Sequence, residues 1–276
     1  MHFTKRITFT LASRANASIN SAAQNITPKS TLLSNRTCLV TNCNATKRDH
    51  PSNIALALAN YGANVIVHAD LHAKVAPLLR LLPIVNPLQR HGFIAARLED
   101  LTEDPSKLQS QIAQFNDSLE VLVHNTAPVT IPKVDPAKYD VGQFDEVVRF
   151  NLTAPFALVQ KLMPLITRAD NPSIVFSSND FSNSDSLEAD KNAYYISKFG
   201  CNSSRMLTKM LAAELQSRGI RVNAVNPGRI TLVPSNETDK TAAYVWLARN
   251  DTIMNGEQLD AKDWISRDPT MYKSFY

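Results

Sequence analysis

The stretch GIRVNAVNPG at residues 219–228 decides the fold, because it places a helix end, a buried strand and a polar turn one after the other. Apolar residues recur with helical spacing over residues 193–217, and Gly219 is of the residue type that most often ends a helix. Residues 221–225 are rich in valine, as expected of a strand that is covered on both faces. The polar turn at residues 226–228 follows, so the stretch predicts a helix that leads into a parallel strand.

The same alternation of short apolar runs and helical periodicity extends along the chain from about Thr37. Further strands are expected at residues 38–41, 64–68, 92–98, 120–124 and 173–176. Further helices are expected at residues 52–60, 105–115, 145–168 and 241–249. Ser52 or Asn53 is the expected cap of the first of these helices, and Gly62 closes it. The sequence therefore predicts an α/β fold, a single doubly wound Rossmann domain at residues 37–276 with a mainly parallel sheet of about seven strands.

The composition is that of a folded domain. The 276 residues are 44% hydrophobic and 20% charged, with a formal net charge of +4, which excludes wholesale disorder. No apolar run approaches the roughly 18 residues that a membrane-spanning helix needs, so no membrane partner is expected. Cys38, Cys43 and Cys201 are too dispersed for a disulfide framework, and the histidines lack ligand spacing, so no metal is expected.

Residues 1–36 form a basic, acid-free N-terminal extension, since no aspartate or glutamate precedes Asp49. Acid-poor, serine-rich segments are typical of organelle transit peptides, but we expect a flexible extension first and a transit peptide as the alternative. We therefore expect a cytoplasmic protein, or a protein of the mitochondrial matrix if the extension is a transit peptide. Its basic residues are not densely clustered and lack interleaved aromatic residues, so no nucleic-acid partner is expected.

A tyrosine and a lysine on one predicted helix form the main candidate for catalysis. Tyr194 and Lys198 lie four residues apart, so the phenol and the ammonium share one helix face. An adjacent cation lowers the pKa of a phenol from its usual value of about 10 toward the range that proton transfer needs. Taken alone, such a pair is more often a contact on the helix surface. Its chemical use depends on the motifs around it.

Those motifs resemble the short-chain dehydrogenase/reductase superfamily over most of residues 37–260. The matches are Tyr194-x-x-x-Lys198, the turn at residues 124–127, the helix asparagine within residues 150–156, the acid at Asp100 and the strand and turn at residues 221–228. They occur in the order that the superfamily has. The resemblance implies the Rossmann fold expected above.

By this resemblance, Tyr194 is the general acid/base at a carbonyl or hydroxyl, and Lys198 lowers its pKa while holding the nicotinamide ribose. Asn151 positions a water in the proton relay. A serine after the fifth predicted strand polarises the substrate oxygen, and Ser178 is the residue expected there. Asn179 is the alternative, because it stands at that position when the motif is counted without gaps.

The resemblance also implies a nicotinamide cofactor, NADP or NAD. Its expected binding residues are Thr41, Asn42, Thr46, Lys47, Arg48, Asp70, Asp100, Leu101, Asn125, Lys198, Pro227, Gly228 and Ile230. The main departure lies in the phosphate loop, where the superfamily carries glycines and this chain has none before Gly62. Asparagine tolerates left-handed backbone, so Asn42 can partly replace the first glycine, whereas Thr46 cannot replace the second. Either Lys47 and Arg48 hold the phosphates by charge, or the affinity for a dinucleotide is weakened or lost.

The choice between NAD and NADP stays open. Asp70 favours NAD if its carboxylate accepts from the ribose hydroxyls, and its alternative role is that of a helix cap before Leu71. Lys47 and Arg48 favour NADP, and this basic pair also resembles the pteridine reductase branch of the superfamily.

The resemblance implies an oxidoreductase that transfers hydride between NAD(P)H and a small carbonyl or alcohol, or a pteridine-like imine. Family analogy further implies a homodimer or a homotetramer. The alternative is a superfamily member with weak or no dinucleotide binding that serves as a binding or scaffold protein. The loop at residues 42–50 distinguishes the two interpretations.

Overall fold

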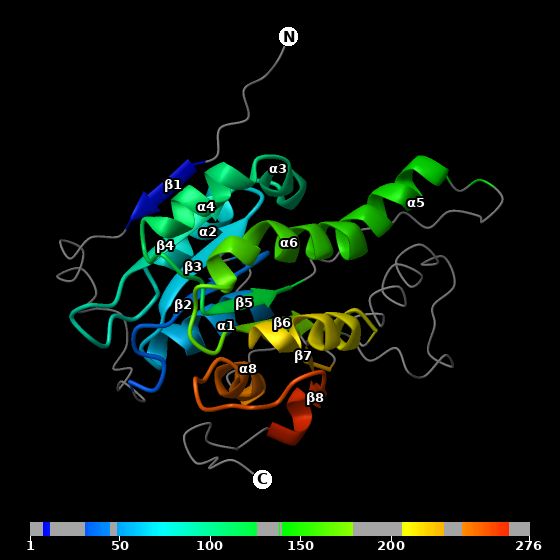
Figure 1. The fold of residues 1–276 in the computed structure, drawn as a ribbon. Helices are drawn as coiled ribbons and strands as arrows, with labels where there is room; N and C mark the ends of the chain where they lie inside the picture. Colours follow the sequence, from blue (N-terminus) through cyan, green and yellow to red (C-terminus); the bar gives the residue numbers. More distant parts are fainter. Residues whose placement is uncertain are drawn as a thin grey trace.

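The computed structural model describes residues 8–11, 31–44, 49–125, 138, 140–178, 206–228 and 239–264. The strands in these residues form one eight-stranded sheet in the order β1-β4-β3-β2-β5-β6-β7-β8 (Figure 1). The strands β2 to β8 are parallel to one another, and β1 pairs antiparallel with β4. The expected Rossmann-type α/β fold is confirmed. The strand bounds are β1 (Thr8–Leu11), β2 (Thr37–Val40), β3 (Asn64–Ala69), β4 (His91–Ala95), β5 (Val121–His124), β6 (Ser173–Ser177), β7 (Arg221–Asn226) and β8 (Gln258–Asp260).

Strand β2 lies in the middle of the sheet, between β3 and β5. The chain order runs outward from β2 through β3 and β4 on one side, and through β5, β6 and β7 on the other. Doubly wound sheets bind ligands beyond the carboxyl ends of the strands where this order reverses. The loops that follow β2 and β5 therefore border the expected ligand site.

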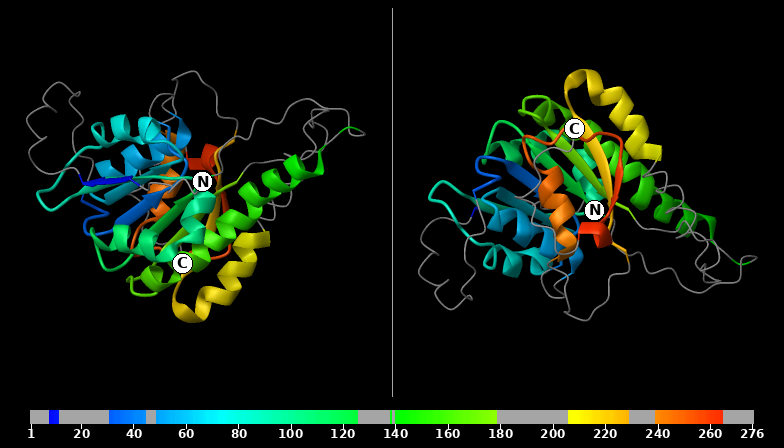
Figure 2. Two further views of the ribbon diagram at one scale, coloured as in Figure 1. Left: turned by 90° about the horizontal axis from the view of Figure 1, so that it is seen from above. Right: turned by 90° about the horizontal axis from the view of Figure 1, so that it is seen from below.

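Helices cover both faces of the sheet (Figure 2). One face packs against α1 (His50–Asn60), α2 (His72–Leu79) and α8 (Ala242–Leu247). The other face packs against α3 (Leu98–Glu103), α4 (Pro105–Ala113), α6 (Ala154–Ile166) and the helical residues 206–215. Successive strand side chains alternate between the two cores, with Val65 and Val67 in the first and Ile66 in the second. No helix in the described ranges is long and apolar enough to cross a membrane.

The helix expected at residues 145–168 is interrupted. It begins earlier, as α5 (Val141–Val148), passes through a π-turn at η4 (Arg149–Thr153) and continues as α6. The Ala154 N–H bonds to the Arg149 carbonyl, five residues back. Pro155 follows and has no N–H to donate to the carbonyl of Asn151, four residues before it. The α-helical ladder is broken at that point, which the periodicity of apolar residues does not reveal.

The segment expected to be an extension contributes to the packed structure. Strand β1 covers the outer edge of β4, with Thr8 opposite Ala95 and Leu11 opposite Gly92. Leu33 is fully buried, and its N–H donates to the Tyr61 carbonyl over 2.8 Å. Residues 8–11 and 31–36 therefore pack with the domain, although its start was expected at residue 37. Residues 1–7 and 12–30 lie outside the described ranges.

Among the other boundaries that differ from expectation, two have a clear local reason. The strand expected at residues 92–98 is β4, which ends at Ala95 because Leu98 already begins α3. The helix expected to be capped by Ser52 or Asn53 is α1, which begins at His50 and is capped by the side chain of Asp49. By contrast, Gly219 ends its helix as expected, in left-handed backbone with φ 70°.

Candidate active site at the carboxyl edge of the sheet

Thr41 joins the two strands at the point where the chain order reverses. It is fully buried directly after β2, and its Oγ1 lies 3.2 Å from His124 Nδ1 at the end of β5. The backbone N–H of Asn125 donates to Thr41 Oγ1 over 2.9 Å, and the Asn125 amide donates to the Thr41 carbonyl over 3.2 Å. These bonds fix the two loops against each other. The structure thus brings together Thr41 and Asn125, both predicted cofactor residues.

Asn42 begins the loop that follows β2 in left-handed backbone, with φ 58°, as expected for a replacement of glycine. Its side-chain amide donates to the Asn125 carbonyl, and its backbone N–H donates to His68 Nδ1 over 3.3 Å. The next backbone N–H, that of Cys43, donates to the His68 carbonyl over 2.8 Å. The end of β3 therefore holds the start of the loop through two of the loop's own backbone donors.

Asn125 is also the end of a partly buried chain of side-chain hydrogen bonds. Ser177, the last residue of β6, donates to Asn125 Oδ1 over 2.5 Å and lies 2.8 Å from the hydroxyl of Tyr244 in α8. That hydroxyl is 3.2 Å from Nε2 of His50, the first residue of α1. Because Ser177 gives its only proton to Asn125, it accepts the proton of Tyr244. Tyr244 in turn accepts from His50. Burial raises the pKa of Tyr244 and lowers the pKa of His50 to about 4, so both side chains are neutral near neutral pH.

Ser178 and Asn151 are both buried near the carboxyl edge. Ser178 directly follows β6 and is 4% exposed, and its Oγ finds no hydrogen-bond partner among the described residues. A buried hydroxyl left unpaired costs free energy, so it is suited to meet an incoming polar group. Asn151 is fully buried in the π-turn. The far end of α6 lies at the amino edge, where the Leu119 N–H donates to the Leu165 carbonyl, so the π-turn faces the carboxyl edge. Such turns are frequent at functional sites.

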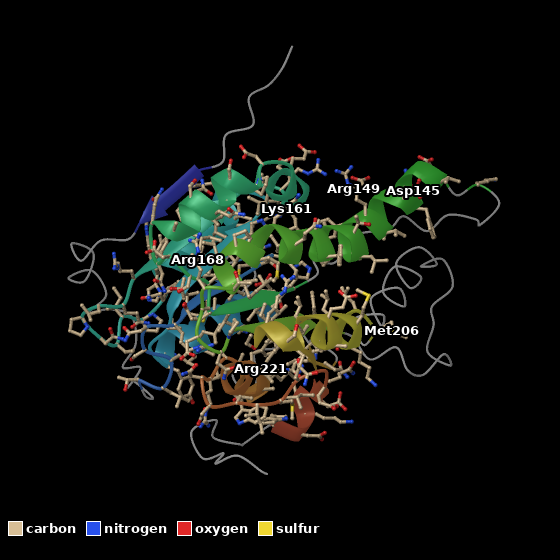
Figure 3. The ribbon with its side chains drawn as sticks, in the orientation of Figure 1. Asp145, Arg149, Lys161, Arg168, Met206 and Arg221 are labelled. Carbon is tan, nitrogen blue, oxygen red and sulfur yellow. The ribbon has the colours of Figure 1, made fainter. Side chains whose placement is uncertain are left out.

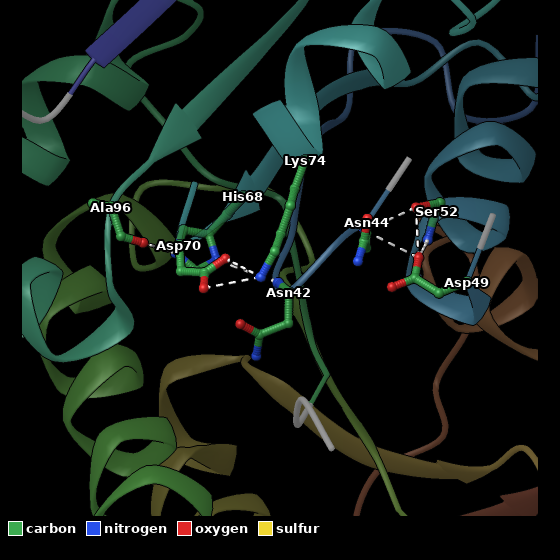
Figure 4. A network of polar contacts seen from close by, with 8 residues as sticks. All are labelled: Asn42, Asn44, Asp49, Ser52, His68, Asp70, Lys74 and Ala96. Carbon is green, nitrogen blue, oxygen red and sulfur yellow. Dashed lines mark hydrogen bonds and ion pairs between the residues drawn. The ribbon is translucent and has the colours of Figure 1, made fainter. Parts of the chain in front are cut away.

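The first turn of α1 is capped by the chain's own carboxylate (Figure 4). Asp49 Oδ1 accepts from the backbone N–H of Ser52 over 3.1 Å, from the Ser52 hydroxyl over 2.6 Å and from the backbone N–H of Asn44 over 3.1 Å. The Asp49 backbone carbonyl accepts from the N–H of Asn53 over 3.1 Å, and Pro51 has no N–H to offer. Burial raises the pKa of Asp49, against the hydrogen bonds that favour its charged form.

Asp70 does not cap the helix that follows it, because the cap position of α2 is Leu71, which makes no side-chain cap bond. The Asp70 carboxylate is instead held by Lys74 Nζ, at 2.7 Å and 3.0 Å from its two oxygens. Both side chains are partly exposed at the end of β3 (Figure 4). The ammonium offsets the negative charge that was expected to favour NAD.

Asp100 and Leu101 lie in α3. Leu101 is 1% exposed, so its side chain belongs to the core. Asp100 lines an open hollow of about 740 Å³ together with residues of α3, α5 and η4. Exposed ion pairs lie along this hollow, from Arg97 to Glu146 at 4.0 Å and from Arg149 to Glu103 at 3.9 Å. Asp145 on α5 and Arg149 at the start of η4 lie on the outer part of the helix that α5, η4 and α6 form (Figure 3). Asp100 thus lies on a surface that carries charges of both signs, between α3 on one side and α5 and η4 on the other.

The other predicted residues divide into two groups. Pro227 and Gly228 follow β7 at the same edge, where the Gly228 N–H donates to Asn226 Oδ1 over 3.0 Å and Gly228 has left-handed backbone with φ 67°. The second group lies outside the described residues and comprises Thr46, Lys47, Arg48, Asn179, Tyr194, Lys198 and Ile230. Within the described ranges, no group of three or more histidine, cysteine, aspartate or glutamate side chains is arranged to hold a metal ion.

A doubly wound sheet with polar loops at its switch point defines a protein of the Rossmann class. The sequence profile described as enoyl-(acyl carrier protein) reductase matches residues 52–263. The chain belongs to this family, within the short-chain dehydrogenase/reductase superfamily of oxidoreductase enzymes.

Individual relatives agree with this assignment. The uncharacterised oxidoreductase YciK of Escherichia coli K12 is 29% identical over 239 residues, covering 82% of this chain and 90% of that protein. The 3-oxoacyl-[acyl-carrier-protein] reductase FabG of Staphylococcus aureus is 32% identical over 183 residues, covering 64% of this chain and 69% of that one. A short-chain dehydrogenase structure from Escherichia coli CFT073, complexed with NADPH, aligns with TM-score 0.68 and 28% identity, covering 84% of this chain and 98% of that one.

The described residues fit one end of a dinucleotide better than the other. At the switch point, the buried hydroxyl of Ser178, which has no partner among the described residues, suits a polar group at the nicotinamide end. At the helix end that would receive the pyrophosphate, the backbone N–H groups of Asn44 and Ser52 are already bonded within the chain, and Asp49 adds a negative charge. The residues there do not fit a phosphate in the arrangement seen.

Sequence reasoning missed Asp49, Ser177, His50 and Tyr244. The signal for Asp49 was present, since an aspartate followed two residues later by a proline is typical of a capped helix start. The chain from His50 through Tyr244 to Ser177 joins residues up to 194 positions apart, and no local pattern predicts it.

Proposed function

We propose that the chain is an NADP(H)-dependent oxidoreductase that transfers hydride between the nicotinamide and a small carbonyl or alcohol, or an imine. The observation that carries the proposal is the buried Ser178 hydroxyl, which lacks a partner among the described residues at the carboxyl edge of a superfamily sheet. A substrate oxygen or nitrogen brought to this edge would satisfy it. The dinucleotide, when bound, supplies the hydride.

Four side chains have proposed roles around the reacting carbon. Ser178 donates a hydrogen bond to the substrate oxygen, with Asn179 as the alternative donor. Tyr194 transfers the proton to that oxygen, and Lys198 lowers the pKa of the phenol. Asn151, fixed by the π-turn, holds the water through which the proton is replaced.

Two observations favour NADP over NAD. The aligned Escherichia coli CFT073 structure is a complex with NADPH. In this chain the Asp70 carboxylate is paired with Lys74 at 2.7 Å, so its repulsion of a 2′-phosphate is reduced. We expect NADPH to bind more tightly than NADH, and the Lys74→Met variant to narrow the difference between their dissociation constants.

The test of catalysis is Tyr194→Phe, with the adjacent Tyr195→Phe as matched control. Loss of the phenol proton donor is expected to lower kcat by about 10²-fold to 10⁴-fold with the dissociation constant of NADPH unchanged. The measurement is loss of NADPH absorbance with a panel of small ketones, 3-oxoacyl thioesters and cyclic imines. Full turnover by Tyr194→Phe would remove the proposed acid.

Cofactor use is tested separately by thermal unfolding with NADPH or NADH. A ligand present at about 100 times its dissociation constant stabilises the folded protein by roughly 2.7 kcal/mol, which raises Tm. If neither dinucleotide raises Tm at millimolar concentration, the alternative of a binding or scaffold protein with lost dinucleotide affinity replaces the proposal.

A further inference from the structure

The N-terminus of α1 and the loop before it present the donors from which nucleotide-binding folds build a phosphate site. Helix N-termini attract anions because their first N–H groups lack partners within the helix and carry partial positive charge. The glycine-rich loops of such folds add further backbone N–H groups. In this chain the described parts of the loop and the first turn are residues 42–44 and 49–53.

Several of the described donors on both sides of this turn already have acceptors within the chain. In the loop, the N–H groups of Asn42 and Cys43 bond to His68, through its ring nitrogen and its carbonyl. The N–H of Asn44 bonds to Asp49 Oδ1 at 3.1 Å and to Ser52 Oγ at 3.1 Å.

In the helix, the N–H of Ser52 bonds to the Asp49 carboxylate, and that of Asn53 makes the first regular helix bond, to the Asp49 carbonyl. Pro51, at the second helical position, has no N–H. A phosphate that approached this turn would meet the donors of Asn44 and Ser52 already in use.

One oxygen of Asp49 gathers three of these donors, from Asn44, from Ser52 N and from Ser52 Oγ (Figure 4). A carboxylate with several converging donors at a helix N-terminus reproduces the contacts that a phosphate oxygen makes there. Its charge also repels a second anion at the same place. Both effects act in the same direction, against the binding of a pyrophosphate.

We propose that the Asp49 carboxylate occupies the position that a phosphate would take at the N-terminus of α1. Dinucleotide binding then requires that this carboxylate moves away, and its negative charge lowers the affinity for the dinucleotide. This rests on the proposed function, since it concerns the same cofactor. Displacement frees the N–H and the hydroxyl proton of Ser52, and leaves the N–H of Asn44 bonded to Ser52 Oγ alone. The two freed Ser52 donors then bond to the pyrophosphate.

The test measures the dissociation constants of NADPH and of inorganic pyrophosphate, the first by cofactor fluorescence and the second by competition, for the full chain and three variants. Asp49→Asn removes the charge and keeps an acceptor, and Asp49→Ser provides a neutral cap. Both residue types are good helix caps, so both variants are expected to fold. Asp140→Asn is the matched control, since Asp140 caps α5 through its Oδ1 and the N–H of Gly142 at 2.9 Å.

Both Asp49 variants are expected to bind NADPH and pyrophosphate at least tenfold more tightly than the unmodified chain, with Asp140→Asn within twofold of it. If the unmodified chain binds NADPH and the Asp49 variants bind it equally or more weakly, the inference is overturned and the proposed function stands. If neither the unmodified chain nor the variants bind NADPH at millimolar concentration, both the inference and the proposed function are overturned. Binding by the variants alone would support the inference while showing that the natural chain has lost the cofactor.

Discussion

The hydroxyl of Tyr244 connects three separate elements at the candidate site. It lies 2.8 Å from Ser177 Oγ on β6 and 3.2 Å from His50 Nε2 on α1, while Tyr244 itself belongs to α8. In Tyr244→Phe, the N–H of His50 would be left buried without an acceptor. We expect the free energy of unfolding to fall by about 1–3 kcal/mol, measured by urea denaturation.

A double-mutant cycle isolates the contact between the two hydroxyls. Tyr244→Phe, Ser177→Ala and the double variant are compared with the unmodified chain, and a coupling free energy of about 0.5 kcal/mol or more is expected for groups in contact. If the two single substitutions lower the free energy of unfolding additively, the two hydroxyls do not interact. That result would contradict the hydrogen bond from Tyr244 to Ser177 deduced above.

At the scale of the element, strand β1 completes the edge of the sheet. It pairs with β4 from Thr8 opposite Ala95 to Leu11 opposite Gly92, and thereby covers backbone groups that an edge strand would expose. Deleting residues 2–12 is expected to speed hydrogen exchange at about every second amide of β4, because the other amides face β3. Hydrogen exchange read by mass spectrometry or NMR measures this.

The control for this deletion removes only residues 2–6, which leaves β1 in place. The exchange of β4 amides is then expected to match that of the full chain. If the β4 amides exchange at the same rate after deletion of residues 2–12, β1 does not protect the edge of β4 in solution. The patterns of β4 and its neighbours predict the sheet without β1. Residues 7–11 do alternate between apolar and polar side chains, as a strand does, but they stand apart from the alternating strands and helices that begin near Thr37.

The elements that the sequence predicts well are those whose local pattern agrees with their packing. The valine-rich strands, the helix start at Pro105 and the left-handed Gly219 are such cases. The π-turn around Asn151 depends on a proline one turn later, and the cap by Asp49 depends on where the loop before α1 ends. At the site, the pairing of Thr41 with Asn125 follows from strand order, which sequence can predict. Which N–H bonds to which acceptor depends on side-chain positions, which sequence patterns do not specify.

At the scale of the whole molecule, two buried neutral histidines couple the fold to pH. Burial lowers the pKa of His50 and of His91 to about 4, compared with about 6.5 in an unfolded chain. Between these values the unfolded chain binds more protons than the folded one. The stabilisation is therefore complete above about pH 6.5, declines as the pH falls and is lost near pH 4. Asp49 acts in the opposite direction, because burial raises its pKa.

His91 offers the cleaner test, because its hydrogen bonds define the neutral form. Its Nδ1 accepts from the Val65 N–H at 3.2 Å, and its Nε2 donates to the Pro83 carbonyl at 2.9 Å, so protonation of Nδ1 would break the first bond. His91→Asn keeps an acceptor for Val65 and does not titrate. Between pH 6.5 and pH 5, the unmodified chain is expected to lose about 1.5 kcal/mol more stability than the variant, because the unfolded histidine is already half protonated at pH 6.5 and each full pKa unit corresponds to about 1.4 kcal/mol. Urea unfolding at the two pH values measures the difference. Equal losses in the two proteins would show that His91 titrates alike in the folded and unfolded chains, and would leave the acid sensitivity of the fold to other groups.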